Sequence, residues 1–219
     1  MITYDAVVND KAVQTYITEA DAYLSALGYT EHSFVHVAQT ATTARYILNA
    51  LGRTEREIEL VSIAAHLHDI GNLVNRADHA QSGAVMAFQI MSRLGASPDD
   101  IATVVTAIGN HDENTAHVLN PISAALILGD KSDVRRSRVS NKDFHTFDIH
   151  DRVNYSVIDS KVTVNDEKTG ISLRLTIDTR YCAIIDYFEI FLGRMLLCRK
   201  AADKLGLVFS LHINGQQLV

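Results

Sequence analysis

Histidine and aspartate side chains recur at the ends of expected helices in the first 130 residues of the chain. The stretch AAHLHDIGN, residues 64–72, places His68 and Asp69 at the end of an apolar run. A buried carboxylate there is costly unless a positive charge neutralises it. A divalent cation would do so, because imidazole and carboxylate groups both bind such ions. A salt bridge with an arginine such as Arg76, or exposure at the helix end, would also make the pair tolerable.

Further imidazole and carboxylate groups lie near the ends or starts of the neighbouring segments. They are His32 and His36, four residues apart; His79 in ADHAQSGA; His111 in IGNHDE; and Asp130 in the apolar run AALILGDKSD. Each histidine taken alone is better explained as a structural residue. Together they predict a metal centre, because helical bundles build metal sites from one or two nitrogen or oxygen ligands on each of several helices.

The elements that would position these side chains are helices between residues 10 and 140. Apolar spacing, capping residues and glycine stops predict six of them: 13–27, ended by Gly28; 30–51, capped by Thr30; 54–71, with a Thr54/Glu57 capping box; 78–94, stopped by Gly95; and two that start at Pro98 and Pro121. On the second of these helices His32 and His36 would share one face. His66 would point away from the face that carries His68 and lie either in the packing or at the surface.

The pattern changes after residue 140. Residues 142–154 show no sustained period and are expected to form a loop. Strands are predicted at 156–164 and 171–177, joined as a hairpin, and at 207–213. The helix predicted at 182–205 is apolar around most of its circumference, so it should be covered by the helical domain or by a second subunit. We therefore expect a mainly α fold, with a helical domain at 1–140, an appendage of antiparallel strands and one long helix at 141–219, and a homodimer.

Composition narrows the class of protein. The chain has 219 residues, 47% of them hydrophobic and 21% charged, as in ordinary globular proteins. Its formal net charge of −6 argues against bulk binding to nucleic acid. Cys182 and Cys198 form no zinc-type pair and are expected to be reduced core residues. The polar start and the lack of a long apolar run predict a cytoplasmic protein without a membrane segment.

The order His, His-Asp, His, His, Asp resembles the HD superfamily of metal-dependent phosphohydrolases over about residues 30–135. The resemblance implies the HD-domain helical bundle, distantly similar to HD-GYP and cyclic-nucleotide phosphodiesterase cores. It implies the following metal ligands: His36, His68, Asp69 and Asp130 for a shared ion, with His79 and His111 for a second ion that Asp69 bridges. The stretch EHSFVHVAQT also resembles the phosphodiesterases, which implies that His32 donates a proton to the leaving group. Such mixed ligands suit Fe, Mn, Co, Ni or Zn.

Two departures limit what this resemblance implies. Many two-metal members continue HDIGK, whereas Asn72 stands in place of that lysine here, and the Gly-Tyr-Pro element of the cyclic-di-GMP hydrolases is absent. Cations for a substrate phosphate must then come from elsewhere. Candidates are Lys131, Arg135, Arg136 and Arg138 in DKSDVRRSRVSNK, and Arg76 in NLVNRADH. A solvated basic turn or an interface is an equally good explanation of the first segment.

The sequence thus predicts a metal-dependent phosphohydrolase that acts on a phosphate mono- or diester, such as a nucleotide or a related small molecule. A metal-activated hydroxide would attack phosphorus, with His32, Asp69 and Lys131 as catalytic residues. Two alternatives use the same ligands. One is a non-catalytic sensor or dimerisation module that keeps its metal for stability, and the other is a di-iron oxygenase of the HD type.

Overall fold

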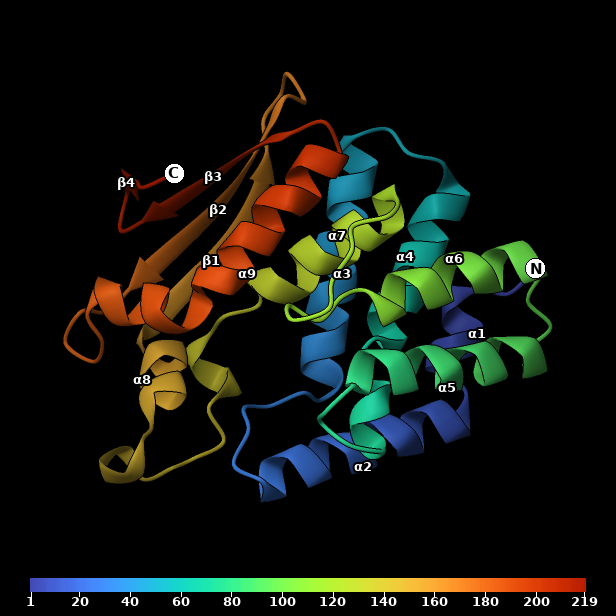
Figure 1. Ribbon diagram of the computed structural model, residues 1–219, viewed down its shortest axis with the longest axis horizontal. Helices are drawn as coiled ribbons and strands as arrows, with labels where there is room; N and C mark the ends of the chain where they lie inside the picture. The colour runs from blue at the N-terminus through green and yellow to red at the C-terminus, as the bar shows by residue number, and fades with distance from the viewer.

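The computed structural model describes residues 1–219, and helices dominate the part of the chain before residue 135 (Figure 1). These elements are α1 (Tyr4–Val8), α2 (Lys11–Ala26), α3 (Phe34–Ala50), α4 (Glu55–Leu67), the 3-10 turn η1 (Ile70–Leu73), α5 (His79–Arg93), α6 (Pro98–Gly109) and α7 (Pro121–Ser132). The Thr54/Glu57 capping box and the two prolines at the first position of α6 and α7 are confirmed.

The start of α3 differs from the prediction. Ser33 caps this helix through its side chain, which accepts from the backbone N–H of Val35, and the helix begins at Phe34 rather than after Thr30. Both residues are good caps, so the local sequence did not separate them. His32 therefore lies in the segment that precedes the helix, while His36 lies in its first turn.

The C-terminal part of the chain surrounds a four-stranded sheet. Its elements are η2 (Arg136–Arg138), η3 (Phe144–Thr146), α8 (Ile149–Ser156), β1 (Val157–Val164), β2 (Gly170–Ile177), α9 (Ile184–Lys204), β3 (Val208–Ile213) and β4 (Gln216–Gln217). The prediction of a loop at 142–154 was wrong over α8. That helix is only eight residues long and is capped by Asp148, too short for a sustained apolar period.

The sheet is mixed, in the order β1-β2-β3-β4. The predicted hairpin of β1 and β2 is confirmed as an antiparallel pair, but β3 pairs with β2 in parallel. The reason is that α9 connects these two strands as a crossover and returns the chain to the same end of the sheet. Asn214 and Gly215, both with positive φ, then turn the chain into β4.

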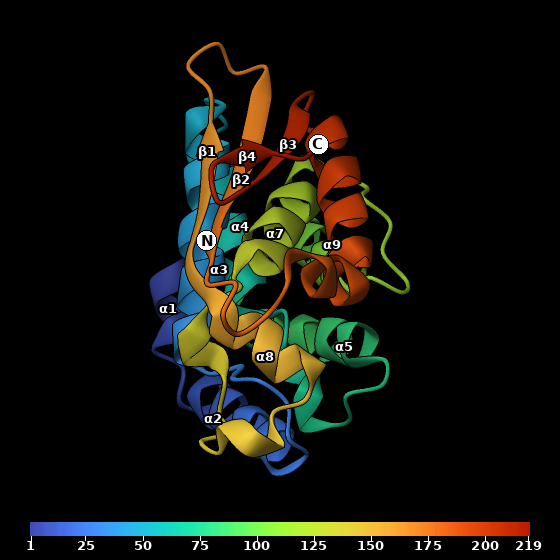
Figure 2. The ribbon, with the colours of Figure 1, turned by 90° about the vertical axis from the view of Figure 1, so that its left-hand side faces the viewer.

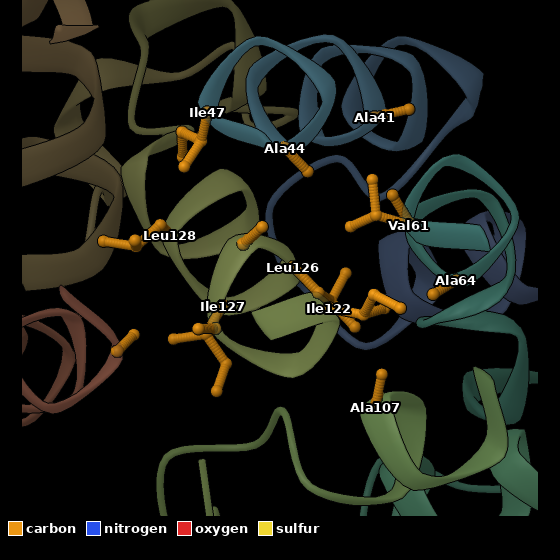
Figure 3. Packing of buried hydrophobic residues seen from close by; sticks show 14 of the residues in the cluster. Ala41, Ala44, Ile47, Val61, Ala64, Ala107, Ile122, Leu126, Ile127 and Leu128 are labelled. Atoms are coloured by element: carbon orange, nitrogen blue, oxygen red, sulfur yellow. The ribbon is translucent and has the colours of Figure 1, made fainter. Parts of the chain in front are cut away.

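Helix α7 lies at the centre of the helical part (Figure 3). Side chains of three helices surround its apolar residues: Ala41, Ala44 and Ile47 of α3, Val61 and Ala64 of α4, and Ala107 of α6. The same buried cluster continues into α9 and the sheet. None of the helices is both apolar and long enough to cross a bilayer.

Helix α9 packs on α7, as its apolar circumference led us to expect (Figure 1). Tyr187 and Phe191 are fully buried in this contact. Ile185, Leu192 and Leu196 remain 71%, 50% and 42% exposed on the same helix. The expected homodimer stays a prediction, and these three side chains are the part of α9 that a second subunit would cover.

Candidate metal centre

Two adjoining groups of buried side chains bring the predicted ligands together. In the first group, Nε2 of His36 lies 3.4 Å from Oδ1 of Asp130 and 3.5 Å from Oδ2 of Asp69. Nε2 of His68 lies 3.7 Å and 3.1 Å from the same two oxygens. In the second group, Nε2 atoms of His79 and His111 lie 3.4 Å and 3.8 Å from Oδ1 of Asp69, and 3.2 Å from each other.

The spacing of these atoms fits the coordination of divalent ions. Two ligand atoms that each lie about 2.1 Å from one ion are about 3.0–3.5 Å apart. The distances in both groups fall close to this range. The oxygens of Asp69 are divided between the groups, with Oδ2 facing His36 and His68 and Oδ1 facing His79 and His111. The donor set can therefore hold two ions that share this carboxylate.

Two glycines allow the ligand-bearing helices to approach this closely. A Cβ at Gly71 would lie 2.0 Å from the backbone oxygen of His79, so only glycine lets α5 begin against η1, the turn that follows α4. A Cβ at Gly129 would lie 2.7 Å from the backbone oxygen of Thr40 on α3. These contacts place His79 beside Asp69, and Asp130 beside His36.

Hydrogen bonds at Nδ1 orient all four imidazoles. The Nδ1–H groups of His68, His79 and His111 donate to the backbone carbonyls of Ala65, Arg76 and Ile108 at 2.8, 3.1 and 2.6 Å. That of His36 donates to Oδ2 of Asp133 at 2.7 Å. This arrangement leaves each Nε2 free as a ligand, as in most histidine metal sites.

Two of these free nitrogens are orphaned. Nε2 atoms of His36 and His68 are fully buried and have no hydrogen-bond partner. Leaving such an atom unsatisfied costs about 1–3 kcal/mol. A cation bound between them and the carboxylates would remove this cost, so the residues present fit a metal.

The electrostatics of the two groups agree with this fit. Burial alone would raise the pKa of Asp69 and of Asp130, but neighbouring cationic groups, His68 beside the former and Lys131 beside the latter, hold both values well below the usual range. Burial alone would lower the pKa of His68, yet Asp69 and Asp130 raise it to about 10. Both carboxylates are thus held in the anionic form that binds metals.

His32 lies beside the first group without belonging to it. Its ring centroid is 5.5 Å from that of His36, and Nδ1 lies 2.5 Å from the backbone oxygen of Thr30. Burial holds the pKa of His32 well below its ordinary value, although Asp69 acts in the opposite direction. The ring is therefore neutral in the free protein at neutral pH.

The comparisons with known proteins agree with this geometry. Residues 33–136 match the family model of the HD domain, a span that contains both ligand groups. This segment is an HD domain. Among curated proteins, an uncharacterised protein of Methanocaldococcus jannaschii is 27% identical over 106 residues, which cover 42% of this chain and 41% of that relative. The chain thus matches less than half the length of this relative.

A solved structure is similar to part of this chain. It is the crystal structure of a predicted HD superfamily hydrolase from an uncultured Thermotogales bacterium, with a TM-score of 0.45 and 22% sequence identity. The match covers 57% of this chain and 68% of that chain.

Within the HD domain, three of the five predicted phosphate contacts lie near the ligands. Lys131 is buried with Nζ 2.8 Å from Oδ2 of Asp130. Arg76 and Arg138 line a neighbouring cavity. The side chain of Arg138 donates three hydrogen bonds, all to the backbone carbonyls of Glu31 and Asp133.

The other two arginines line neither of the two cavities beside the ligands. Arg135 pairs with Asp133 and with Glu31 at 2.9 and 2.8 Å. The guanidinium of Arg136, which follows α7, lies 4.5 Å from the ring centroid of Tyr155 and donates to the backbone oxygen of that residue. Phosphate binding by these two arginines stays a prediction, and in this structure Arg136 connects the chain after α7 to α8. His66 is buried against the rings of Tyr4 and Phe34, so it lies in the packing rather than at the surface.

Two adjoining cavities open beside the ligands. One, of about 460 Å³, contains His32 and Arg76 and is bounded by α8 and α9, outside the HD domain. The other, of about 580 Å³, contains His79 and Arg76. In both views α8 lies beyond one end of the sheet, toward the side of the molecule that holds α2 (Figures 1 and 2), which explains how C-terminal residues reach this site.

Sequence reasoning missed three residues of the site. Asp133 holds His36, Asn72 donates to Oδ1 of Asp69 at 3.1 Å, and Arg194 of α9 lines the first cavity. The second acid in GDKSD was a signal for Asp133, because it lies only three residues after Asp130, directly after the helix that carries this ligand. A single arginine inside the apolar run FLGRMLL was the signal for Arg194.

Proposed function

We propose that this protein is a metal-dependent phosphohydrolase that binds two divalent ions and cleaves a phosphate mono- or diester of a small molecule, such as a nucleotide. The observation that carries the proposal is the division of the Asp69 carboxylate between two groups of buried imidazoles. A structural ion needs a closed shell of about four ligands. Six ligands around a shared carboxylate, next to open cavities, favour a centre that also binds substrate.

The chain's own residues have distinct parts in this proposal. His36, His68 and Asp130 would hold one ion and His79 and His111 the other, with the carboxylate of Asp69 available to both. Bound there, the ions would supply an activated water as nucleophile and stabilise negative charge on the phosphate. Lys131 keeps Asp130 ionised and adds positive charge beside the phosphate.

Arg76 and His32 lie where the rest of the substrate would enter. Arg76 borders both cavities, and its side chain donates to Oδ1 of Asn72 at 3.2 Å. It can therefore reach a phosphate that lies over the ligands. A bound phosphate would favour the protonated form of His32, because an opposite charge nearby raises the pKa of an imidazole. His32 would then donate its proton to the leaving oxygen.

The test combines elemental analysis with a substrate panel. The protein purified without chelators should contain two transition-metal ions per chain and should hydrolyse members of a panel of aryl phosphates, phosphodiesters and nucleotides. Asp69→Asn should lose both ions and all activity. His117→Ala is the matched control, since this exposed histidine lies outside both groups and should change neither.

Two results would contradict the proposal. One is metal-replete protein that hydrolyses no phosphate ester in the panel. The other is oxygen consumption by iron-loaded protein with an organic substrate, which would indicate the oxygenase alternative instead. A content of one ion per chain under metal-replete conditions would remove the shared role of Asp69.

A further inference from the structure

The cavity of about 460 Å³ beside the metal ligands has walls from two parts of the chain. The HD domain contributes Arg76 and Glu113, and α9 contributes Phe191 and Arg194. Because α9 lies outside the family's matched span, its side chains can distinguish this protein's substrate from those of other HD proteins. Arg194 is the only cation that α9 supplies to this cavity.

Arg194 is held in place by its neighbours, but its guanidinium has hydrogen-bond donors without well-aligned acceptors. Its guanidinium carbon lies 4.3 Å from the ring centroid of Phe191, in a cation–π contact that fixes the side chain over the cavity wall. Its Nε lies 2.6 Å from Oε1 of Glu113. That oxygen is nevertheless buried without a hydrogen-bond partner, so the angle between the two groups is unfavourable. The guanidinium thus lacks the bidentate contact, two parallel hydrogen bonds to two oxygens of one anion, that arginine forms best.

Glu113 lies between positive charges rather than within one optimised pair. Its Oε1 is also 3.5 Å from Nζ of Lys131, which contacts the metal ligand Asp130. The same carboxylate borders both cavities. The carboxylate of Glu113 now compensates the positive charge of Arg194. An anionic group of the substrate that entered the cavity would contact Arg194 at the same place.

We propose that Arg194 is a specificity-determining residue that binds an anionic group of the substrate in this cavity, in place of its contact with Glu113. This proposal rests on the proposed function, since it assigns the group beyond the phosphate that would be cleaved. The substrate is a phosphate ester with a second oxyanion, either a phosphate or a carboxylate. Both present the two oxygens that a guanidinium fork binds.

Two carboxylates on another wall of the cavity limit the negative charge of this substrate. Asp148 and Asp151 line the cavity on the side of α8, so a further anionic group placed against that wall would be repelled. The cavity volume lies in the range of sites for small molecules. The substrate class is therefore a compact ester with two anionic groups and an uncharged or cationic remainder.

The experiment measures oxyanion binding to metal-free protein, which separates Arg194 from the metal ions. Inorganic phosphate and, separately, acetate are titrated at low ionic strength while the Nε–H signals of arginines are followed by NMR. Phosphate should shift the Arg194 signal and saturate. Arg194→Ala should weaken phosphate binding about tenfold, the loss of one charge-assisted contact. A parallel response to acetate indicates a carboxylate group, and a response to phosphate alone indicates a second phosphate.

Three further variants make the result specific. Glu113→Gln should strengthen phosphate binding, because it removes the competing carboxylate. Arg199→Ala, which removes an exposed arginine of the same helix, should leave binding unchanged. Arg194→Lys keeps the charge without the fork and should bind phosphate more weakly than the wild type, and it serves if Arg194→Ala does not fold. Equal phosphate affinity of wild type and Arg194→Ala, or weaker binding by Glu113→Gln, would overturn the proposal.

Failure of the proposed function gives a different result. The metal-loaded protein could hydrolyse none of the esters while its phosphate binding still depended on Arg194. That result would support the anion site and contradict the proposed hydrolase function. Conversely, the protein could hydrolyse a phosphate ester while wild type and Arg194→Ala bind phosphate equally well. That result would contradict only the role of Arg194.

Discussion

The Nδ1 atom of His36 lies 2.7 Å from Oδ2 of Asp133, a carboxylate that belongs to neither group of metal ligands. This carboxylate follows α7 directly, three residues after the ligand Asp130. It fixes the ring of His36 with Nε2 toward the metal centre. Carboxylates in this position also make the imidazole a stronger ligand.

Asp133→Asn should therefore lower metal affinity about 10–100-fold while the fold is kept. Asp112→Asn is the matched control. Its carboxylate lies 3.9 Å from Nδ1 of His79, which already donates to the backbone oxygen of Arg76. Competition with a chelating indicator dye measures both affinities. Equal losses in the two variants would show that general negative charge matters rather than the bond to His36.

Much of this centre follows from residue types and positions in the sequence. His68 and Asp69 end an apolar helix, and Asp130 interrupts another. Burying these groups costs free energy that a bound cation would offset. The six ligands that the resemblance implied are adjacent in the structure. Their roles remain predictions until metal is measured.

Other features depend on packing that the sequence does not encode locally. Arg135, Arg136 and Arg138 fall within four residues around a 3-10 turn, yet Arg135 and Arg138 contact Glu31 and Asp133 whereas Arg136 lies on the ring of Tyr155. Arg194 reaches the cavity only because α9 packs on α7. No local pattern predicts such a long-range contact.

The pH dependence of the metal-free protein follows from His68. Asp69 and Asp130 outweigh burial and raise its pKa to about 10, above the ordinary value of 6.5. A raised folded-state pKa adds stability that is fully present below pH 6.5 and is lost as the pH rises through about 10. Urea unfolding of the metal-free protein should show this decline between pH 6.5 and 10, and His68→Gln should lack it.

Metal affinity should change with pH in the opposite direction. His36 also has a raised pKa, because the nearby carboxylates of Asp130, Asp133 and Asp69 outweigh its burial. A metal must displace these protons, so affinity should rise with pH up to about 10. Chelator competition at several pH values measures this slope. A flat profile would show that the imidazoles are already neutral at pH 7.

Gly71 should be the most sensitive glycine of the centre. Gly71→Ala forces a Cβ to within 2.0 Å of the backbone oxygen of His79, so α5 must move. We expect a loss of about 3 kcal/mol or more in unfolding free energy. The shift should also separate His79 from Asp69 and lower the occupancy of the second metal site.

A second glycine provides the control for this prediction. Gly193 lies within α9 with nothing within 4 Å of a built Cβ, so Gly193→Ala should stabilise the protein by about 0.5–1 kcal/mol. Urea unfolding and elemental analysis measure both variants. A stable Gly71→Ala protein with full metal content would contradict the close approach of η1 and α5.

His32 is the residue whose role is most sharply testable, because ligand, proton donor and packing residue predict different outcomes. Its Nδ1–H donates to the backbone oxygen of Thr30, so Nε2 is the atom available for a leaving group. His32→Ala should keep both ions, since six other ligands hold them. Hydrolysis of an ester with a poor leaving group should fall by about 10²–10⁴-fold, the usual value of a general acid.

Leaving-group dependence provides the decisive comparison. An aryl phosphate with a good leaving group needs little protonation, so its hydrolysis should fall much less in His32→Ala than that of an alkyl ester. Metal content, measured in the same samples, separates the alternatives. A loss of one ion would make His32 a ligand. Full metal content with unchanged rates for both esters would leave His32 only a packing role beside His36.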